Sequence, residues 1–222
     1  MSEVGHPARN GQRSRSVETR GAILAAAGRV FAEGGLAGAR TDAIAAAAGV
    51  NKAMLYYYFK SKSQLYEAVV EEHFAELNRR ALAVLTSPGR AGDVLLRYVD
   101  TYFDFISARR RYAPLFQQMM LAGGQTLERV VRRYFEPRSR ALDQLLERGM
   151  RSGEFRRADR AHTALSIVAL IVFYFSAARV LQVLGPPNAY SEAGLERRKR
   201  EVLDFIRHAV FRAPAGGKKR RN

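Results

Sequence analysis

One stretch, from residue 41 to residue 62, constrains the fold more than any other: TDAIAAAAGVNKAMLYYYFKSK. It opens with Thr41, a residue type that favours the N-cap of a helix, and continues with alanine and isoleucine at helical spacing. Gly49 tolerates the left-handed conformation that follows a helix, so we expect the first helix to end there. Asn51 is the expected N-cap of a second helix. Helix, glycine-containing turn and helix in this order predict a helix-turn-helix pair.

The second helix, expected over residues 51 to 60, has two different faces. Leu55, Tyr58 and Phe59 share one face by their spacing, and we expect them to pack on the first helix. The other face carries basic, small and phenolic side chains, namely Lys52, Ala53, Tyr56, Tyr57 and Lys60. Ammonium groups and phenol hydroxyls bind phosphates, while small or apolar side chains can approach base edges. This face therefore suits the major groove of DNA, and an ordinary solvated helix face is the alternative.

A third helix is expected directly after the second. Ser61 and Gln64 match a capping box, which predicts a helix start near Lys62. Apolar residues continue at helical spacing as far as Leu85, and the sequence Thr-Ser-Pro-Gly at residues 86–89 is the first clear break. This long helix would begin in the helix-turn-helix region and continue into the domain that follows, so it could transmit a mechanical signal.

These motifs resemble the DNA-binding signature of the TetR family of bacterial regulators. The matching residues read GVNKAMLYYYFKSKSQL after an alanine-rich helix, and the resemblance extends over roughly residues 17 to 70. Asn51, Ala53 and Met54 stand where the family more often has Ser, Gly and Thr, which leaves the operator sequence open. The resemblance implies an all-α homodimer. Each copy would have an N-terminal three-helix helix-turn-helix DNA-binding domain followed by a helical ligand-binding and dimerisation domain.

The resemblance also implies roles for individual side chains at the DNA. Those expected at phosphates are Thr41, Tyr56, Lys60 and Lys62. Those expected nearest the bases are Lys52, Ala53 and Tyr57. Asn51 could contact either part of the DNA, or could act only as a helix cap.

Composition sets broad limits on the kind of protein. The net charge is +16, which favours polyanionic partners but does not separate a DNA-binding protein from one that binds a membrane surface. The absence of cysteine excludes disulfides and thiolate chemistry. The first sixteen residues lack the apolar run of a secretory signal. We therefore expect a cytoplasmic protein.

Changes in composition along the chain predict four segments. Residues 1–16 are expected to be a basic disordered arm, which could also touch the DNA backbone or minor groove. Residues 17–62 would form the helix-turn-helix domain, residues 63–212 the ligand-binding and dimerisation domain, and residues 213–222 a basic disordered tail. The remaining predicted helices are Val17–Glu33, Gly92–Ala108, Tyr112–Ala122, Thr126–Met150 with a kink before Pro137, Ala161–Leu184 and Ser191–Phe211.

The most apolar segment, residues 161–184, raises the alternative of a membrane-associated basic protein. Its central apolar run is bracketed by Arg160 and Arg179 and is shorter than the roughly 20 residues that a membrane span needs. A helix that is apolar on every side is otherwise buried, as happens when it serves both a core and a dimer interface. The sequence therefore favours a homodimer that does not enter a membrane.

The C-terminal region is rich in aromatic residues and methionine, which could line a ligand cavity or simply form the core. The candidates for ligand contact are Phe105, Phe116, Met119, Met120 and Tyr174. Glu72, His73 and Glu76 lie within one turn, but we expect them on a solvated helix face rather than at a metal. No catalytic motif or phosphate-binding glycine loop is evident, so neither an enzyme nor a cofactor is expected. A helical enzyme remains an alternative.

Together these features predict a ligand-responsive, DNA-binding transcriptional regulator. Its partners would be a double-stranded, palindromic DNA operator, a second copy of the chain and a largely apolar small-molecule inducer. The expected action is repression, relieved when the inducer binds.

Overall fold

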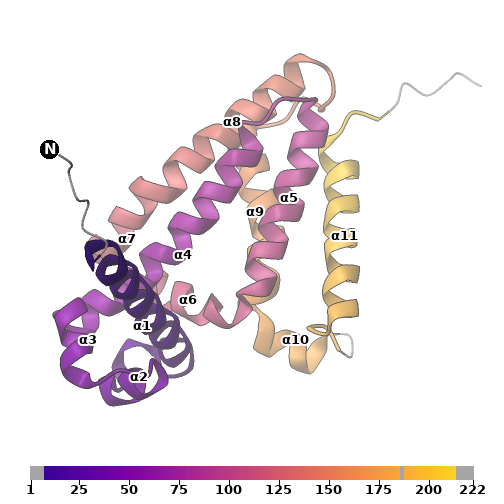
Figure 1. The fold of residues 1–222 in the computed structure, drawn as a ribbon. Helices are drawn as coiled ribbons and strands as arrows, with labels where there is room; N and C mark the ends of the chain where they lie inside the picture. The colour runs from indigo at the N-terminus through magenta and orange to yellow at the C-terminus, as the bar shows by residue number, and fades with distance from the viewer. Residues whose placement is uncertain (1–7, 186–187, 214–222) are drawn as a thin grey trace, which may run out of the picture. The chain divides into compact units, whose positions relative to one another are not determined.

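The computed structural model describes residues 8–185 and 188–213, and these residues form helices joined by short connections (Figure 1). The only extended pairing among them is an isolated antiparallel bridge between Phe155 and Phe211. The predicted all-α class is confirmed. The helices are α1 (Ala8–Gly38), α2 (Thr41–Ala47), α3 (Lys52–Tyr58), α4 (Lys62–Leu85), α5 (Ala91–Ala108), α6 (Ala113–Ala122), α7 (Gly124–Val130), α8 (Glu136–Arg151), α9 (Arg160–Ser176), α10 (Ala178–Leu184) and α11 (Glu192–Val210).

Contacts within the chain divide it into two compact units. The first unit takes the described residues up to Phe74 together with Arg111–Leu127, and the second takes Ala75–Arg110 and the described residues from Glu128 onward. Helix α4 contributes to both units. The boundary expected between residues 62 and 63 differs from this division, because the first turns of α4 pack into the first unit. There the ring of Tyr66 lies 5.3 Å from that of Phe31, and its hydroxyl donates to the carbonyl of Leu115 at 3.1 Å.

Helix α1 begins earlier than expected. It starts at Ala8 rather than Val17, so the prediction of a disordered arm is wrong for residues 8–16, while residues 1–7 lie outside the described residues. Arginine and glutamine have good helix propensity, and the polar stretch joins the helix without needing a buried face. The hydroxyl of Ser14 also donates to the carboxylate of Glu18 at 3.0 Å. The regular helix is interrupted at Gly35, whose φ is 65°, close to its predicted end.

The core of the first unit comes from the predicted apolar stripes. Fully buried residues are Ile23, Ala27, Phe31, Ile44, Leu55 and Leu65, from α1, α2, α3 and the start of α4. Burying each large aliphatic or aromatic side chain contributes about 1.5–3 kcal/mol. This core fixes α3 by one face, so its opposite face stays free. His73 also belongs to this unit and is buried, with its ring 4.4 Å from that of Phe116, so the expectation of a solvated histidine is wrong.

Helix α5 is the centre of the second unit, where it contacts α8, α9 and α11. Its buried side chains include Val94, Leu95, Tyr98, Val99, Phe103 and Phe105. On its outer side, Lys199 of α11 lies 3.0 Å from Asp104 and 3.4 Å from Asp100. Burial lowers the pKa of Lys199, but hydrogen bonds to Asp104 and Glu196 outweigh this effect and raise the pKa above its ordinary value. These ion pairs help to fix α11 against α5.

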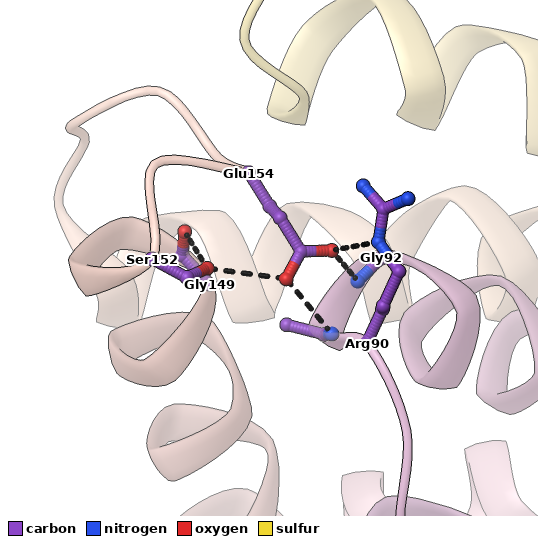
Figure 2. A network of polar contacts seen from close by, with 6 residues as sticks. Arg90, Gly92, Gly149, Ser152 and Glu154 are labelled. Carbon is purple, nitrogen blue, oxygen red and sulfur yellow. Dashed lines mark hydrogen bonds and ion pairs between the residues drawn. The ribbon is translucent and has the colours of Figure 1, made fainter.

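The N-terminus of α5 is capped by a side chain that is distant in sequence (Figure 2). The carboxylate of Glu154 accepts hydrogen bonds from the backbone N–H groups of Ala91 at 3.2 Å and Gly92 at 3.0 Å. It also accepts from the hydroxyl of Ser152 at 3.1 Å and lies 3.5 Å from the guanidinium of Arg90. The helix dipole favours an anion at this end. The loop after α8 is thereby attached to the start of α5.

The break expected before Pro137 is confirmed. Residues Val131–Phe135 form a π-helical turn between α7 and α8, in which the N–H of Glu136 donates to the carbonyl of Val131. Proline cannot donate to the carbonyl four residues earlier, and its ring crowds that carbonyl. The wider π turn accommodates both effects.

The apolar segment 161–184 is not one helix. It bends by 71° at Ala177 into α9 and α10, so the single helix expected there is wrong. Within the described residues, no single helix is both long enough and apolar enough to cross a membrane, although the bent pair passes on length and composition. The buried side of α9 carries Ile167, Ile171, Tyr174 and Phe175. In the single chain Leu165, Phe173, Val180, Val183 and Leu184 are exposed, so the expected burial on every side would need a partner chain to cover them.

Candidate nucleic-acid interface

Local sequence determines the conformation of the helix-turn-helix pair. Gly49 has a φ of 68°, the left-handed conformation that the sequence predicts for it. The side chain of Asn51 accepts a hydrogen bond from the N–H of Met54 at 2.7 Å, which confirms Asn51 as the N-cap of α3. At α2 the prediction is wrong by one residue. Arg40 occupies the N-cap position without a side-chain hydrogen bond, and Thr41 is the first helical residue.

Helix α3 has the two faces that its sequence predicts. Leu55 is fully buried and Phe59 is 5% exposed, with the guanidinium of Arg20 5.2 Å from the Phe59 ring. On the opposite face Tyr57 is 81% exposed and Tyr56 is 41% exposed. The exposed residues of the predicted DNA-binding face are Asn51, Lys52, Ala53, Tyr56, Tyr57 and Lys60. The structure therefore gathers cations, phenols and a small side chain on one accessible surface.

Tyr58 lies between the two faces. Its spacing predicts a core residue, but it is only half-buried, with its hydroxyl donating to that of Ser16 on α1 at 3.2 Å. Its ring meets that of Tyr57 edge to face, with the centroids 5.2 Å apart. The ring of Tyr57 thus has a supporting neighbour, although Tyr57 itself is almost fully exposed.

Lys52 and Lys60 differ in their electrostatic surroundings. Lys52 lies 2.9 Å from the carboxylate of Asp42 on α2, and both groups are exposed. The hydrogen bond and charge of Lys52 lower the pKa of Asp42, and the same contact raises the pKa of Lys52. Among the described residues, no carboxylate pairs with Lys60, which is also exposed. Lys60 is therefore the cation of this face whose charge has no partner in the part of the chain that the structure describes.

Lys62 is placed differently from the other expected phosphate ligands. Its ammonium donates to the carbonyl of Ala39 at 3.1 Å and to that of Ala37 at 3.3 Å, where α1 ends. A cation at the carbonyl end of a helix is favourable. Two of the three N–H donors of Lys62 are therefore used in hydrogen bonds to the backbone where α1 leads into α2. The contact spans more than twenty residues of sequence, so no local pattern indicates it.

The five predicted ligand contacts do not form one cluster inside either unit. Phe116, Met119 and Met120 belong to the first unit, where Met119 is buried and Met120 is 62% exposed. Phe105 and Tyr174 belong to the second. Phe105 is buried core, with the guanidinium of Arg109 4.3 Å from its ring. Tyr174 lines a pocket of about 540 Å³, and its hydroxyl donates to the carbonyl of Ala189 at 2.6 Å.

A larger pocket of the second unit contains residues that sequence reasoning missed. It has a volume of about 610 Å³ and is lined by Tyr98 of α5, by Arg138 of α8 and by residues of α9. Arg138 is only 6% exposed. A signal for it is present in the sequence, because Tyr134, Arg138 and Leu142 recur at spacings of four within the helix predicted over residues 126–150. Because such a row predicts the buried face of a helix, an arginine in the middle of it is expected to be buried together with its charge.

Comparisons with known proteins match both halves of this architecture. A sequence model of bacterial regulatory proteins of the tetR family matches residues 23–69, and a model of the tetracyclin repressor-like C-terminal domain matches residues 93–206. A regulator from Saccharomonospora viridis, solved in complex with choline, has a similar fold. Its TM-score is 0.71 at 22% identity, with 89% of this chain and 100% of that chain covered.

Two curated relatives are similar over the N-terminal part. The transcriptional activator FasR of Mycolicibacterium smegmatis is 39% identical over 98 residues, which are 44% of this chain and 45% of FasR. The transcriptional repressor NicS of Pseudomonas putida is 35% identical over 88 residues, which are 38% of this chain and 42% of NicS. The chain thus spans less than half the length of these relatives. The C-terminal model alone covers more than half of the chain, and with the match to the helix-turn-helix region it shows that the chain belongs to the tetR family of bacterial regulatory proteins.

Proposed function

We propose that this protein is a ligand-responsive transcriptional repressor that binds a palindromic operator as a homodimer and leaves it when a small molecule binds. The observation that carries the proposal is the exposed face of α3. Tyr56 and Tyr57 project from a helix whose other face is fixed in the core by Leu55. The helix ends at Tyr58, two residues earlier than expected, so Lys60 is exposed just after the buried C-cap residue Phe59. A rigid helix with exposed cations and phenols suits a major groove lined by phosphates.

The roles along α3 follow from side-chain chemistry. Tyr56 of α3 and Lys60, which follows the extended C-cap residue Phe59, would bind phosphates. Such contacts set the position of the helix without reading sequence. Ala53 and Tyr57 form the neighbouring row and would approach base edges, where a small side chain or a ring can contact a thymine methyl group. Lys52 would share its charge between Asp42 and the DNA. The net charge of +16 would add general affinity through counterion release.

A second copy of the chain would cover the exposed apolar residues of the second unit. The most exposed are Val183 and Leu184 of α10, Phe173 and Leu165 of α9 and Phe205 of α11. Monomeric proteins rarely leave so many large apolar side chains in water unless a partner covers them. Two recognition helices about one turn of DNA apart, or a near multiple, would then read a palindromic site.

Ligand control requires only a modest free energy. If the ligand favours a conformation in which the two recognition helices are wrongly spaced, each ~1.4 kcal/mol of differential affinity weakens DNA binding tenfold. Such a protein acts as a regulator rather than as an enzyme. It would work in the cytoplasm, where the DNA is.

The proposal is tested by selecting bound duplexes from a random DNA pool with the purified chain, followed by a screen for small molecules that release the selected DNA. We expect the wild-type protein to enrich a palindrome. Tyr57→Ala should change which sequences are enriched, whereas Tyr56→Ala should enrich the same sequences with lower recovery. A chain that enriches no sequence, or that remains monomeric when bound to DNA, would contradict the proposal. Uniform loss of recovery for Tyr57→Ala would remove its role in base recognition.

A further inference from the structure

Within the described residues, the second unit contains a buried cation without a counterion. Arg138 of α8 is 6% exposed, and its guanidinium lies 5.1 Å from the ring of Tyr102 and 5.1 Å from that of Phe135. In the part of the chain that the structure describes, no carboxylate pairs with it, and its Nη1 has no hydrogen-bond partner. The two rings offset part of the electrostatic penalty through cation–π contacts, but they do not give Nη1 a hydrogen-bond acceptor. A buried charge in this state is unfavourable unless something else pairs with it.

A second polar group beside it is also unsatisfied. Tyr98 of α5 is fully buried, and its hydroxyl has no hydrogen-bond partner within the described residues. Burial raises the pKa of Tyr98 above its ordinary value, and the charge of Arg138 opposes this shift only in part. The hydroxyl of Tyr98 therefore stays protonated at neutral pH and can donate a hydrogen bond. Native proteins contain few buried polar atoms without partners, so two such donors near each other point to a missing acceptor.

Both side chains line the same pocket. Its volume of about 610 Å³ falls within the roughly 300–1,000 Å³ of typical small-molecule sites. Apolar residues make up much of the remaining lining, namely Phe135, Leu142, Ala161, Ala164, Leu165 and Val168. The acidic residue of this pocket, Asp143, pairs with Arg160 at 2.8 Å. The lining therefore combines a buried cation and a buried phenol with a set of apolar side chains.

We propose, on the basis of the regulatory function proposed above, that this pocket binds the effector and that the effector is an organic carboxylate with an apolar body. Arg138 and the hydroxyl of Tyr98 would donate hydrogen bonds to the carboxylate oxygens, and the apolar lining would hold the body. A guanidinium presents parallel N–H donors that match the two oxygens of a carboxylate. A neutral ligand would leave the charge of Arg138 unpaired, and a cation would be repelled by it.

The test measures binding to the full-length chain by titration calorimetry, which requires no DNA. The probes are octanoate, cyclohexanebutyrate and 4-butylbenzoate, each compared with its primary alcohol, together with octyltrimethylammonium. We expect at least one carboxylate to bind at least about tenfold more tightly than its alcohol, since hydrogen bonds to charged groups contribute this much. The cation should not bind. If no carboxylate binds more tightly than its alcohol, the proposal is wrong.

Variants assign the effect to the two side chains. Arg138→Met should weaken binding of the best carboxylate by about ten- to a hundredfold and remove its preference over the alcohol. Tyr98→Phe, which keeps the ring, should weaken it by a smaller factor. The matched control is Arg140→Met, because Arg140 lines the same pocket but is exposed and pairs with Glu136. Equal losses in Arg138→Met and Arg140→Met would indicate general attraction rather than this site.

A DNA-release assay separates this inference from the function on which it depends. The best carboxylate should release wild-type protein from its selected DNA but should leave Arg138→Met bound. If the wild-type chain selects no DNA yet binds carboxylates through Arg138, the pocket assignment stands and the repressor function fails. If the chain selects DNA but its binding of carboxylates does not depend on Arg138 or Tyr98, the repressor function stands and the pocket assignment fails.

Discussion

The exposed face of α3 and the pocket of the second unit use the same chemistry in opposite environments. Each combines a cation with a phenol: Lys60, just after α3, with Tyr56 and Tyr57 of α3, and Arg138 with Tyr98 in the pocket. At α3 these groups are exposed to water, whereas the Nη1 of Arg138 and the hydroxyl of Tyr98 are buried and have no acceptor among the described residues. Exposed groups are hydrated until a partner arrives, but buried groups remain unsatisfied without one. The difference separates a surface that binds a long polyanion from a site that selects one small anion.

The environments also predict different links between stability and function. An exposed side chain away from special features can be changed with an effect on stability within about 0.5 kcal/mol. A buried, unpaired charge lowers stability, so replacing it can stabilise the protein while abolishing its function. Variants on α3 should therefore affect DNA binding alone, and variants in the pocket should affect ligand binding and stability in opposite directions.

The largest effect is expected for the double variant Tyr56→Ala and Lys60→Ala. Losing two phosphate contacts should weaken DNA binding about a hundredfold on every sequence, at about tenfold for each charged or hydrogen-bonded contact. The dependence of affinity on salt should also become shallower by about one ion, because Lys60 no longer displaces a counterion. Fluorescence anisotropy with labelled duplexes at several salt concentrations measures both quantities.

The control for that variant is Arg200→Ala, which removes one positive charge from an exposed position on α11. It should change affinity little. If the double variant instead altered base preference, or melted several degrees below the wild-type protein, the phosphate role of the exposed face would be wrong.

The next largest effect is expected on stability in the pocket. Without ligand, Arg138→Met should leave the free energy of unfolding unchanged or raise it by up to about 2 kcal/mol, because removal of an unpaired buried charge outweighs the lost cation–π contacts. Urea denaturation followed by circular dichroism measures this value. The exposed counterpart, Lys60→Met, should change it by less than about 0.5 kcal/mol. A clear loss of stability in Arg138→Met would mean that Arg138 serves the folded chain itself and that the contrast with α3 is false.

Lys62 tests whether every lysine of the DNA-binding region is available to the DNA, as Lys60 is. Its ammonium donates to the carbonyls of Ala37 and Ala39, so Lys62→Met should lower the free energy of unfolding by about 1 kcal/mol. Thermal melting of Lys62→Met and Lys60→Met side by side makes the comparison. Unchanged stability combined with a uniform loss of DNA affinity would return Lys62 to the phosphate role that the family resemblance implies.

Glu154 is an intermediate case, because its carboxylate is half-buried and is paired with several donors. Glu154→Gln should lower the free energy of unfolding by about 1 kcal/mol at neutral pH, the usual effect of a lost helix cap. Hydrogen bonds from the backbone of Gly92, and then of Ala91, lower the pKa of Glu154, with burial opposing them. A lowered folded-state pKa stabilises the fold above the unfolded value of about 4.5, and this stabilisation is lost as the pH falls through the folded pKa.

The difference between wild type and Glu154→Gln should therefore be largest near neutral pH and should shrink below about pH 4.5. Urea denaturation at a series of pH values measures it. Glu201→Gln on the exposed surface of α11 is the control and should show no such trend. A difference independent of pH would mean that the carboxylate charge is not what caps α5.

Features set by neighbouring residues could be predicted from the sequence. The N-cap at Asn51, the left-handed Gly49 and the break before Pro137 each depend on a few adjacent residues, and the structure has all three. The exposed face of α3 follows from helical spacing in the same way. The start of α1 was placed too late because polar residues of good helix propensity give no apolar pattern to mark a helix.

Features set by distant residues could not be predicted. The bend at Ala177 has no proline or glycine at the break, so the sequence 161–184 gives no local signal for two helices. The carbonyl partners of Lys62 belong to Ala37 at the end of α1 and Ala39 just after it, far from Lys62 along the chain. Arg138 could have been flagged by its apolar row, but its lack of a counterion depends on how α5, α8 and α9 pack. The candidate ligand site was missed for the same reason.

The smallest effect is expected at Asp42, whose carboxylate partly neutralises the positive charge of the exposed face of α3. Asp42 holds Lys52 at 2.9 Å, and the contact lowers the pKa of Asp42, so this carboxylate stays charged at neutral pH. Asp42→Asn should therefore raise DNA affinity by roughly threefold at low salt, because Lys52 is released and one negative charge near the phosphates is lost. The gain should fade as salt screens the charges.

The control is Asp93→Asn, an exposed change of equal charge on α5, which should not raise DNA affinity. Lower affinity in Asp42→Asn would instead mean that the ion pair with Asp42 holds Lys52 in the position from which it contacts the bases. The contact within the protein would then favour DNA binding rather than oppose it.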